Sequence, residues 1–399
     1  MISFIRIIAN GIDDLIRNGI ITTRTKVVVY GLDRYSFAIR TILSHRNIGV
    51  SAFLSDDMNE VLRTRRNIKD FACRYFNSER DAISIVSVEE IETEKALFED
   101  DFVILIASDK HISIKNTLNE LGFKENTDYY IVYDFYDNEI DGAIEGKQRL
   151  TLQDIQNCGR QMLKIIDEFC TGRNLRYWAS GGTMLGAVRH NGFIPWDDDV
   201  DLFMPLKDYL EFLEEFPQND RYIFKGYGPW GCGEFHDIFV RLIDRETVMD
   251  HNMKIVREIS GIWLDIFPLV GLPSDEAERK LYFRKYQELE KSILQDFYET
   301  DGDLGVFKKR FPEQEAFLTR YDFDRSEYVG VLGTQYGEKD NTSRHVYDDT
   351  IRMKFDDGQV NVPIGYREYL TALYGDDWME IPRTGERISL HTINAYKAR

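Results

Sequence analysis

The chain has 399 residues, 43% of them hydrophobic and 13% aromatic, a composition that supports folded cores and excludes a disordered protein. Its length suits two domains, or at most three. Its 69 acidic residues outnumber its 50 lysines and arginines, so the net charge is −19. Because such a surface repels polyanions and no long basic tract offsets it, the sequence argues against a nucleic-acid partner.

The sequence shows neither a membrane-spanning segment nor a disulfide framework. No apolar run approaches the roughly 20 residues that span a bilayer, and the N-terminus lacks the pattern of a signal peptide. We therefore expect a cytoplasmic protein with free thiols, associated at most peripherally with the inner face of a membrane. The cysteines lie without metal-binding spacing at Cys73, Cys158, Cys170 and Cys232.

The first 20 residues carry apolar side chains at helical spacing. Such a helix can pack into a core or lie on a membrane surface. Asp13 and Asp14, with few basic residues beside them, favour packing. The apolar positions are Ile5, Ile8, Ile12, Leu15 and Ile16.

Residues 1–145 have the pattern of a Rossmann-like α/β domain. The run KVVVY at 26–30 predicts a buried strand, Gly31 permits a turn, and a helix and a second strand follow. Asp56 and Asp57 stand where a dinucleotide-binding domain has its ribose-binding acid. However, GLDRYS at 31–36 has one glycine where that fingerprint needs three, and Asp33 would face a pyrophosphate. A scaffold, partner or regulatory domain is therefore favoured over NAD binding and over a dehydrogenase.

A second domain is expected over residues 146–399, after a linker in EIDGAIEGKQR at 139–149. Thr151 and Asp154 form a capping-box pattern at the start of a helix that Gly172 is expected to end. The C-terminal part is expected to be mostly helical, with a hairpin in RMKFDDGQVNVPI at 352–364.

The segment SGGTMLGAVRHNGFIPWDDDVDLFMP at 180–205 places four aspartates in five positions between apolar flanks. On a strand, Asp199 and Asp201 would share one face, with Asp197 able to join them and Asp198 facing away or in the preceding turn. Carboxylates this close repel unless a cation bridges them. Oxygen ligands without His or Cys favour Mg²⁺ or Mn²⁺.

Three other interpretations of this acidic run compete with a metal site. A solvated loop is common for charge runs, but the apolar flanks argue against it. A calcium-binding EF-hand loop fails, because it needs glycine where Leu202 stands and glutamate where Asp208 stands. A helix cap would use one aspartate, whereas this run has four.

A further acid, Asp265, lies within the apolar run SGIWLDIFPLVG at 260–271. A lone carboxylate there is costly unless an arginine or backbone amides satisfy it, or a metal binds it. If it meets Asp199 and Asp201 from an adjacent strand, the three form the carboxylate cluster of polymerase-like nucleotidyltransferases.

The residues upstream of the aspartates suit a phosphate-binding turn. A short strand at 176–179 leads into glycines that begin a helix, where backbone N–H groups can approach a phosphate. Arg189 and His190, at the far end of that helix, could reach a phosphate or an acidic acceptor, although an ordinary ion pair and a structural histidine remain open. The turn consists of Ser180, Gly181, Gly182 and Thr183.

The stretch YWASGGTMLGAVRHNGFIPWDDDVDLFMP at 177–205 closely resembles the signature of the LicD family, which includes bacterial phosphocholine transferases and, more distantly, fukutin and fukutin-related protein. The likeness continues through VRLIDRETV at 240–248, WLDIFPLVG at 263–271 and the tail at 353–391. It covers about residues 150–399. One departure is that the insert LGAVRHNGFIPW separates the glycines from the aspartates more widely than in the general nucleotidyltransferase pattern.

The resemblance implies an α+β nucleotidyltransferase-like fold and a Mg²⁺- or Mn²⁺-dependent transfer. A phospho-alcohol, such as phosphocholine or phosphoribitol, would move from a CDP-activated donor to a sugar hydroxyl of a cell-surface glycan or a lipid-linked saccharide. Asp265 would be a third metal ligand or general base, and Arg189 would neutralise developing charge. The implied metal ligands are Asp197, Asp199, Asp201 and Asp265, and the implied donor-binding residues are Ser180, Gly181, Gly182, Thr183 and Arg241.

Two other functions remain open from the sequence. A sugar-nucleotide-dependent glycosyltransferase also uses a D-x-D motif to hold a metal-bound diphosphate, but it would not place a Gly-Gly helix start just upstream. A non-catalytic glycan- or nucleotide-binding protein would not need the aspartates. Aromatic residues could stack on a cytosine base or enclose a quaternary ammonium group, or simply pack in the core; these are Trp178, Trp196, Tyr227, Trp230 and Trp263.

Overall fold

The computed structural model describes residues 4–32, 34–66, 84–108, 111–134, 144–226, 239–252, 257–334, 337–383 and 394–398. Asp33, Cys73, Tyr227, Trp230, Cys232 and the first part of the expected linker lie outside these residues. The chain forms two compact units. The first comprises Met1–Gly142 with Met253–Arg257 and Gln295–Asp303, and the second comprises the remainder.

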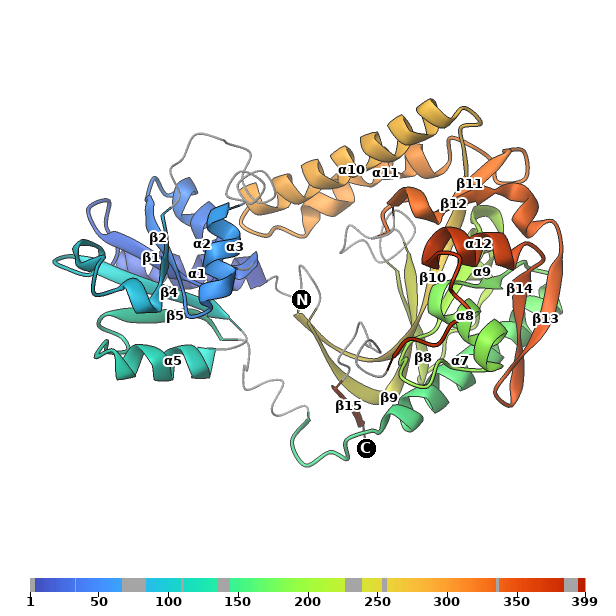
Figure 1. The fold of residues 1–399 in the computed structure, drawn as a ribbon, viewed down its shortest axis with the longest axis horizontal. Coiled ribbons are helices and arrows are strands. Elements are labelled where there is room, and N and C mark those ends of the chain that lie inside the picture. Colours follow the sequence, from blue (N-terminus) through green and yellow to red (C-terminus); the bar gives the residue numbers. More distant parts are fainter. Residues whose placement is uncertain are drawn as a thin grey trace. The chain divides into compact units, whose positions relative to one another are not determined.

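The first unit is built on a five-stranded parallel sheet with strand order β3-β2-β1-β4-β5 (Figure 1). This is the order of a doubly wound α/β fold, and its switch point lies between β1 and β4. The strands are β1 (Lys26–Tyr30), β2 (Val50–Ser55), β3 (Ile85–Ser87), β4 (Phe102–Ser108) and β5 (Tyr129–Asp134). The helices are α1 (Phe4–Arg17), α2 (Arg34–His45), α3 (Met58–Arg66) and α5 (His111–Glu120).

Neighbouring residues of the strands face opposite sides of this sheet. Leu54 of β2 belongs to one apolar cluster with Ile114 and Leu118 of α5. The preceding residue, Phe53, contacts Phe37 of α2, with ring centroids 5.5 Å apart. Helices therefore cover both faces, which explains why the strands are apolar throughout rather than alternating.

Helix α1 packs into the first unit, as its spacing and its two aspartates predict. At Gly11 the helix approaches β5 so closely that a Cβ atom would lie 3.1 Å from the carbonyl oxygen of Val132. Among the described residues, no helix combines the length and the apolar character needed to cross a bilayer. The buried residues of α1 are Phe4, Ile5, Ile8, Ala9, Ile12 and Leu15.

Aromatic rings meet beside the loop where a dinucleotide fingerprint would lie. Tyr35, in the first turn of α2, stacks on Tyr133 of β5 with centroids 5.5 Å apart. Phe4 contacts Tyr35 edge-on at 5.0 Å. Packed rings therefore lie next to the loop that leads into α2.

A branched ion pair joins α1, α2 and the segment at 295–303 within the first unit. The guanidinium group of Arg46 donates to Asp13 at 2.9 and 3.1 Å and to Asp301 at 2.9 and 2.8 Å. Arg6 also donates to the carbonyl oxygen of Thr300. These contacts explain why the end of α10 (Glu276–Glu299) and the residues after it belong to this unit.

The second unit contains a mixed eight-stranded sheet (Figure 1). Its path is β12-β11-β10-β7-β6, and β9 pairs with β10, β8 and β15. Its strands are β6 (Trp178–Ala179), β7 (Asp201–Pro205), β8 (Tyr222–Gly226), β9 (Val240–Asn252), β10 (Arg257–Leu272), β11 (Tyr328–Gly330), β12 (Asn341–Ser343) and β15 (Asn394–Lys397). Its helices are α7 (Leu152–Arg173), α8 (Gly181–His190), α9 (Leu206–Glu215), α10, α11 (Gly305–Leu318) and α12 (Tyr366–Tyr374).

Helix α7 begins as its capping box predicts but ends later than expected. The side chain of Thr151 accepts from the backbone of Asp154, whose carboxylate accepts from the backbone of Thr151. The expected stop at Gly172 is wrong, because the helix continues to Arg173. Asn174 ends it in the left-handed conformation (φ 58°), donating to carbonyl groups of the last turn.

The strands that carry the acidic residues lie at the centre of the large sheet. β7 runs parallel to β10 and antiparallel to β6. Leu202 and Met204 of β7 are fully buried, as are Leu264 and Ile266 of β10. The apolar flanks noted in the sequence thus anchor both acidic segments in one core.

The C-terminal part is mixed rather than mostly helical. β11 and β12 extend the large sheet through short runs that the helical pattern conceals. The expected hairpin is present as β13 (Thr350–Phe355) and β14 (Gly358–Pro363). It lies beside β6 and α8, and the backbone N–H of Asp356 donates to the carbonyl oxygen of Asn191.

An ion pair with a fully buried carboxylate holds β9 in place. Asp244 is 0% exposed and accepts from Arg221 at 3.1 and 2.8 Å and from the backbone N–H of Glu246 at 3.0 Å. A carboxylate in this position depends on its donors, because water cannot replace them.

We predict that Arg221→Ala lowers the free energy of unfolding of the second unit by about 3 kcal/mol, because it leaves Asp244 buried without its cation. Urea denaturation followed by tryptophan fluorescence measures this unit specifically. All five tryptophans, Trp178, Trp196, Trp230, Trp263 and Trp378, belong to it.

The matched control is Arg344→Ala. Arg344 pairs with Asp348 at 2.7 Å, but both side chains are substantially exposed. Its loss is expected to cost less than about 1 kcal/mol. Equal destabilisation by the two substitutions would contradict the structural importance of the buried pair.

Candidate functional site

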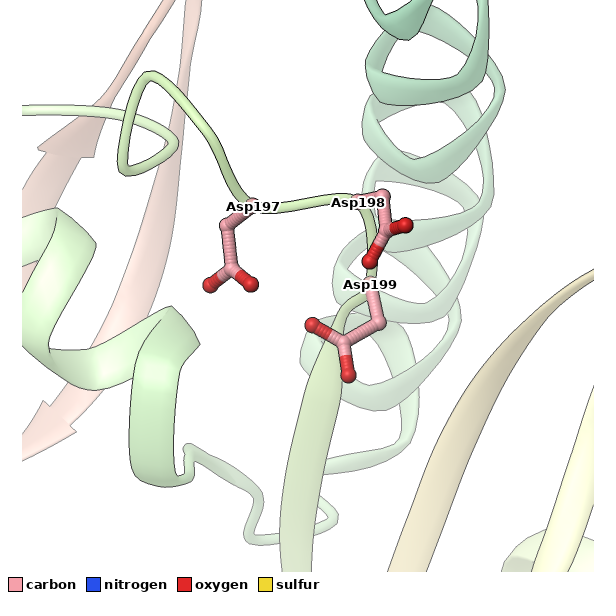
Figure 2. Close-up of side chains that lie close together, drawn as sticks. All are labelled: Asp197, Asp198 and Asp199. Atoms are coloured by element: carbon pink, nitrogen blue, oxygen red, sulfur yellow. The ribbon is translucent and has the colours of Figure 1, made fainter. Parts of the chain in front are cut away.

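The aspartate segment leaves a turn and enters β7 with alternating burial. Asp197, Asp199 and Asp201 are partly exposed, whereas Asp198 and Val200 are buried. Figure 2 shows the carboxylates of Asp197 and Asp199 on the same side of the segment, with that of Asp198 next to Asp199. The burial pattern is the alternation that the sequence predicts for a strand with one face on the core.

The first three aspartates form a compact group. One carboxylate oxygen from each of Asp197, Asp198 and Asp199 lies within 4.8 Å of the other two. The sequence left Asp198 either facing away from the other aspartates or in the turn before the strand. In the structure Asp198 lies before β7, which starts at Asp201, and it stays close to Asp197 and Asp199 although its side chain is buried.

Asp265 reaches the same region from the neighbouring strand. It is the register partner of Asp201 across the parallel β7–β10 pair, and its N–H donates to the carbonyl oxygen of Val200 at 2.9 Å. Its carboxylate accepts from Nε of Arg241 at 2.9 Å and from the indole N–H of Trp263 at 3.2 Å. The sequence left two alternatives for Asp265: pairing with an arginine, or meeting the other aspartates. In the structure both occur.

The electrostatics of this site are dominated by burial and like charge. Burial raises the pKa of Asp201 well above its usual value, and the nearby Asp199, Asp265 and Asp197 raise it further. Burial also raises the pKa of Asp265, although Arg241 opposes that effect. A protein without a bound cation must therefore hold a proton, or leave adjacent carboxylate charges uncompensated, at this point of the sheet.

The residues fit a hard divalent cation. The donor set is made of carboxylate oxygens, without sulfur or imidazole, and this chemistry matches Mg²⁺ or Mn²⁺. The charge of the cluster exceeds what Arg241 alone can balance. Asp197, Asp199 and Asp201 line the partly exposed side of the segment, so a cation could enter from solvent.

The glycine turn is tied to the aspartates. Gly181, the first residue of α8, has φ +46°, and its N–H donates to the hydroxyl oxygen of Tyr369 at 3.3 Å. A Cβ atom at Gly182 would lie 2.7 Å from Oδ2 of Asp197, which is closer than such contacts occur. A larger residue at 182 would therefore push the Asp197 carboxylate away from the helix.

Thr183 fixes the register of the acidic strand. Its hydroxyl oxygen accepts from the N–H of Asp201 at 2.9 Å. The N–H of Ser180, the residue before α8, donates to the carbonyl oxygen of Asp201 at 2.9 Å. The Ser-Gly-Gly-Thr turn thus positions the carboxylates, a role that the sequence pattern for phosphate binding does not predict.

Arg189 has partners other than the expected phosphate. Its guanidinium donates to the carbonyl oxygens of Trp378 and Glu380 at 2.8 and 2.9 Å and to Nε2 of His190 at 3.0 Å. Arg189 therefore holds the segment after α12 against the end of α8. Burial and the adjacent Arg189 lower the pKa of His190, so a neutral imidazole can accept this hydrogen bond.

Of the tryptophans noted in the sequence, one packs in the core and two lie near residues of the candidate site. Trp178 is buried and donates to Thr350, so it packs in the core. Trp263 stacks under Arg241, whose guanidinium carbon lies 4.5 Å from its ring. Trp196 contacts His190 edge-on at 6.1 Å.

Two tyrosines of α12, Tyr369 and Tyr374, lie at the glycine turn, and sequence reasoning missed both. The Tyr374 hydroxyl lies 3.7 Å from the position that a Cβ atom would take at Gly181. Their distance along the chain from the glycines conceals this proximity. The resemblance of the tail to a family signature was the only sequence signal pointing to this region.

Comparisons with known proteins agree with this geometry. Residues 174–290 match the family model described as LicD/FKTN/FKRP, nucleotidyltransferase domain. The matched range contains the glycine turn, the four aspartates, Arg241 and Asp265.

Individual relatives extend the likeness. The chain is 25% identical over 274 residues to the lipopolysaccharide cholinephosphotransferase LicD of Haemophilus influenzae, covering 62% of this chain and 99% of that protein. It is 59% identical over 49 residues to the human ribitol 5-phosphate transferase FKRP, covering 12% of this chain and 10% of FKRP. It is 25% identical over 228 residues to mannosyltransferase regulator 14 of Saccharomyces cerevisiae, covering 47% and 22%.

The family match and the near-complete alignment with the Haemophilus protein coincide with the part of the chain that carries the carboxylate cluster. Residues 174–290 therefore carry a LicD-type nucleotidyltransferase domain, and the chain is an enzyme of the phosphotransferase class.

Proposed function

We propose that this enzyme transfers a phospho-alcohol from a CDP-activated donor to a sugar hydroxyl of a cell-surface glycan or its lipid-linked precursor. The observation that carries the proposal is the group of carboxylates just before β7, at its start and on β10, held against a glycine turn at the start of α8. The relatives named for cholinephosphate and ribitol 5-phosphate transfer support this reaction class. We place the reaction in the cytoplasm, at the inner face of the membrane.

The chain's own residues would act as follows. Asp197, Asp199 and Asp201 would hold a divalent cation, which would offset the negative charge of the donor's diphosphate. Asp265 remains a candidate third ligand or general base for the acceptor hydroxyl. Because Arg241 and Trp263 donate to Asp265, they would fix the direction of its carboxylate.

The start of α8 would receive the donor's phosphate. Backbone N–H groups at a helix N-terminus, together with the helix dipole, favour an anion there. Gly181 already donates to Tyr369, so the amides that follow it are the candidates for phosphate contact. We drop Arg189 from the transfer step, because its guanidinium holds the segment after α12.

The experiment that tests the donor is calorimetric titration with CDP-choline, CDP-ribitol, CDP-glycerol and a UDP-sugar, each with and without Mg²⁺. We expect Mg²⁺-dependent binding of one CDP-alcohol. Preference for the UDP-sugar would support a glycosyltransferase instead. Product analysis then separates a phosphodiester from a glycosidic bond.

A non-catalytic role is the other function to distinguish. The yeast relative is named as a regulator of a mannosyltransferase, so likeness to this family does not by its name alone require transfer. Binding of a CDP-alcohol without release of CMP in the presence of acceptor glycans would support that alternative.

We predict that Asp199→Asn lowers turnover at least about a hundredfold at saturating Mg²⁺, because the amide loses the charge that holds the cation. The measurement is release of CMP from the CDP-alcohol identified by calorimetry. Asp357→Asn is the matched control, since Asp357 lies on the β13–β14 turn with its side chain 90% exposed. Full activity of Asp199→Asn would refute the metal assignment.

We also predict how removal of one charge from the cluster changes the urea midpoint of the second unit, first without metal and then with it. Without metal, Asp201→Asn should raise the urea midpoint of the second unit, because it relieves repulsion in the cluster. Added Mg²⁺ should raise the midpoint of the wild type, by linkage, and raise that of Asp201→Asn much less. Equal Mg²⁺ effects on both proteins would place the cation elsewhere.

A further inference from the structure

Tyr374, the last residue of α12, faces the glycine turn from a part of the chain outside the matched nucleotidyltransferase range. Its side chain is 36% exposed, so a ligand can reach it. The point that a Cβ atom would occupy at Gly181 lies 3.7 Å from Oη of Tyr374 and 3.8 Å from Oδ2 of Asp201. A phenol and a candidate metal-binding carboxylate therefore flank one point at the start of α8.

Gly181 leaves this point without a side chain. Among the described residues, apart from its chain neighbours and the backbone of its own helix, Tyr374 and Asp201 provide the heavy atoms within 4 Å of it. Both distances are ordinary van der Waals contacts, so the hydroxyl and the carboxylate both lie beside Gly181 without crowding it. The left-handed φ of +46° at this residue is a second reason for glycine here.

Several contacts hold the end of α12 at this position. The Tyr369 hydroxyl accepts from the N–H of Gly181 one helical turn before Tyr374. Just after the helix, the indole N–H of Trp378 donates to Thr371 at 3.1 Å, and Arg189 binds the backbone of Trp378. Contacts before and after the last residue of α12 thus hold the Tyr374 hydroxyl in place.

We propose that Tyr374 is a substrate-binding residue whose hydroxyl donates a hydrogen bond to a phosphoryl oxygen of the donor, opposite the cation held by Asp201. The inference rests on the proposed function and deepens it. A phosphoryl group over Gly181 would meet the N-terminal end of α8, the cation and this hydroxyl together. A phenol can donate to such an oxygen, whereas Asp201 cannot, because its ionised carboxylate only accepts.

The two tyrosines of α12 then have different tasks. Tyr369 is buried and accepts from the turn, so it orders the protein itself. Tyr374 is partly exposed and its hydroxyl lies beside Gly181, so it is the tyrosine that can contact a ligand. Removal of the Tyr369 hydroxyl should lower stability, whereas removal of the Tyr374 hydroxyl should weaken phosphate binding.

The experiment measures binding of inorganic pyrophosphate with Mg²⁺ to the full-length protein by calorimetry. Tyr374→Phe should weaken binding about tenfold, because it removes one hydrogen bond to a charged group. Tyr366→Phe is the matched control, since Tyr366 begins the same helix two turns away and should bind as the wild type does.

A second readout guards against a structural explanation. Tyr374→Phe should leave the urea midpoint unchanged, whereas Tyr369→Phe should lower it. With the CDP-alcohol that the enzyme transfers, Tyr374→Phe should lower kcat/KM by about tenfold or more. Wild-type affinity of Tyr374→Phe for pyrophosphate would overturn the proposal, and so would the absence of pyrophosphate binding to the wild type.

The failures of this inference and of the proposed function can be told apart. If no CDP-alcohol is bound or transferred, yet Tyr374→Phe still weakens pyrophosphate binding selectively, the proposed function falls and the role of Tyr374 stands. If a CDP-alcohol is transferred equally well by the wild type and by Tyr374→Phe, the proposed function stands and this inference falls.

Discussion

Repulsion among carboxylates beside a hydrophobic core is the constraint on which the second unit depends. Asp201 and Asp265 face each other in register on adjacent parallel strands, with Asp199 and Asp197 close enough to raise the pKa of Asp201. Arg241 compensates only part of this charge. The apolar side chains of β7 and β10 stabilise an arrangement that its acids alone would disfavour, and a bound divalent cation would remove the conflict.

The residues around the carboxylates hold them in position. Gly182 gives Asp197 room, Thr183 accepts from the backbone of Asp201, and Trp263 donates to Asp265. The insert between the glycines and the aspartates forms most of α8 and the turn after it, so it brings the two motifs together despite their separation in sequence. The C-terminal helix α12 completes the site from a distant part of the chain.

The first unit has its own sheet, its own core and no residue in this cluster. Packed aromatic rings link α1, the start of α2 and the end of β5 within it. The segment at 295–303, which contains the end of α10, is joined to the rest of this unit through Arg46. The polypeptide thus passes repeatedly between the two units.

The sequence by itself determined the parallel sheet of the first unit, the capped start of α7, the helix at the glycine pair and the alternation along the aspartates. Each of these depends on local spacing, which backbone geometry translates directly into structure. Tertiary structure alone decided that Asp265 would meet both Arg241 and Asp201, that Arg189 would bind carbonyl groups of the C-terminal segment, and that Tyr374 would reach Gly181. Such contacts join residues far apart in the chain, and their partners depend on strand order and helix packing, which local patterns do not encode.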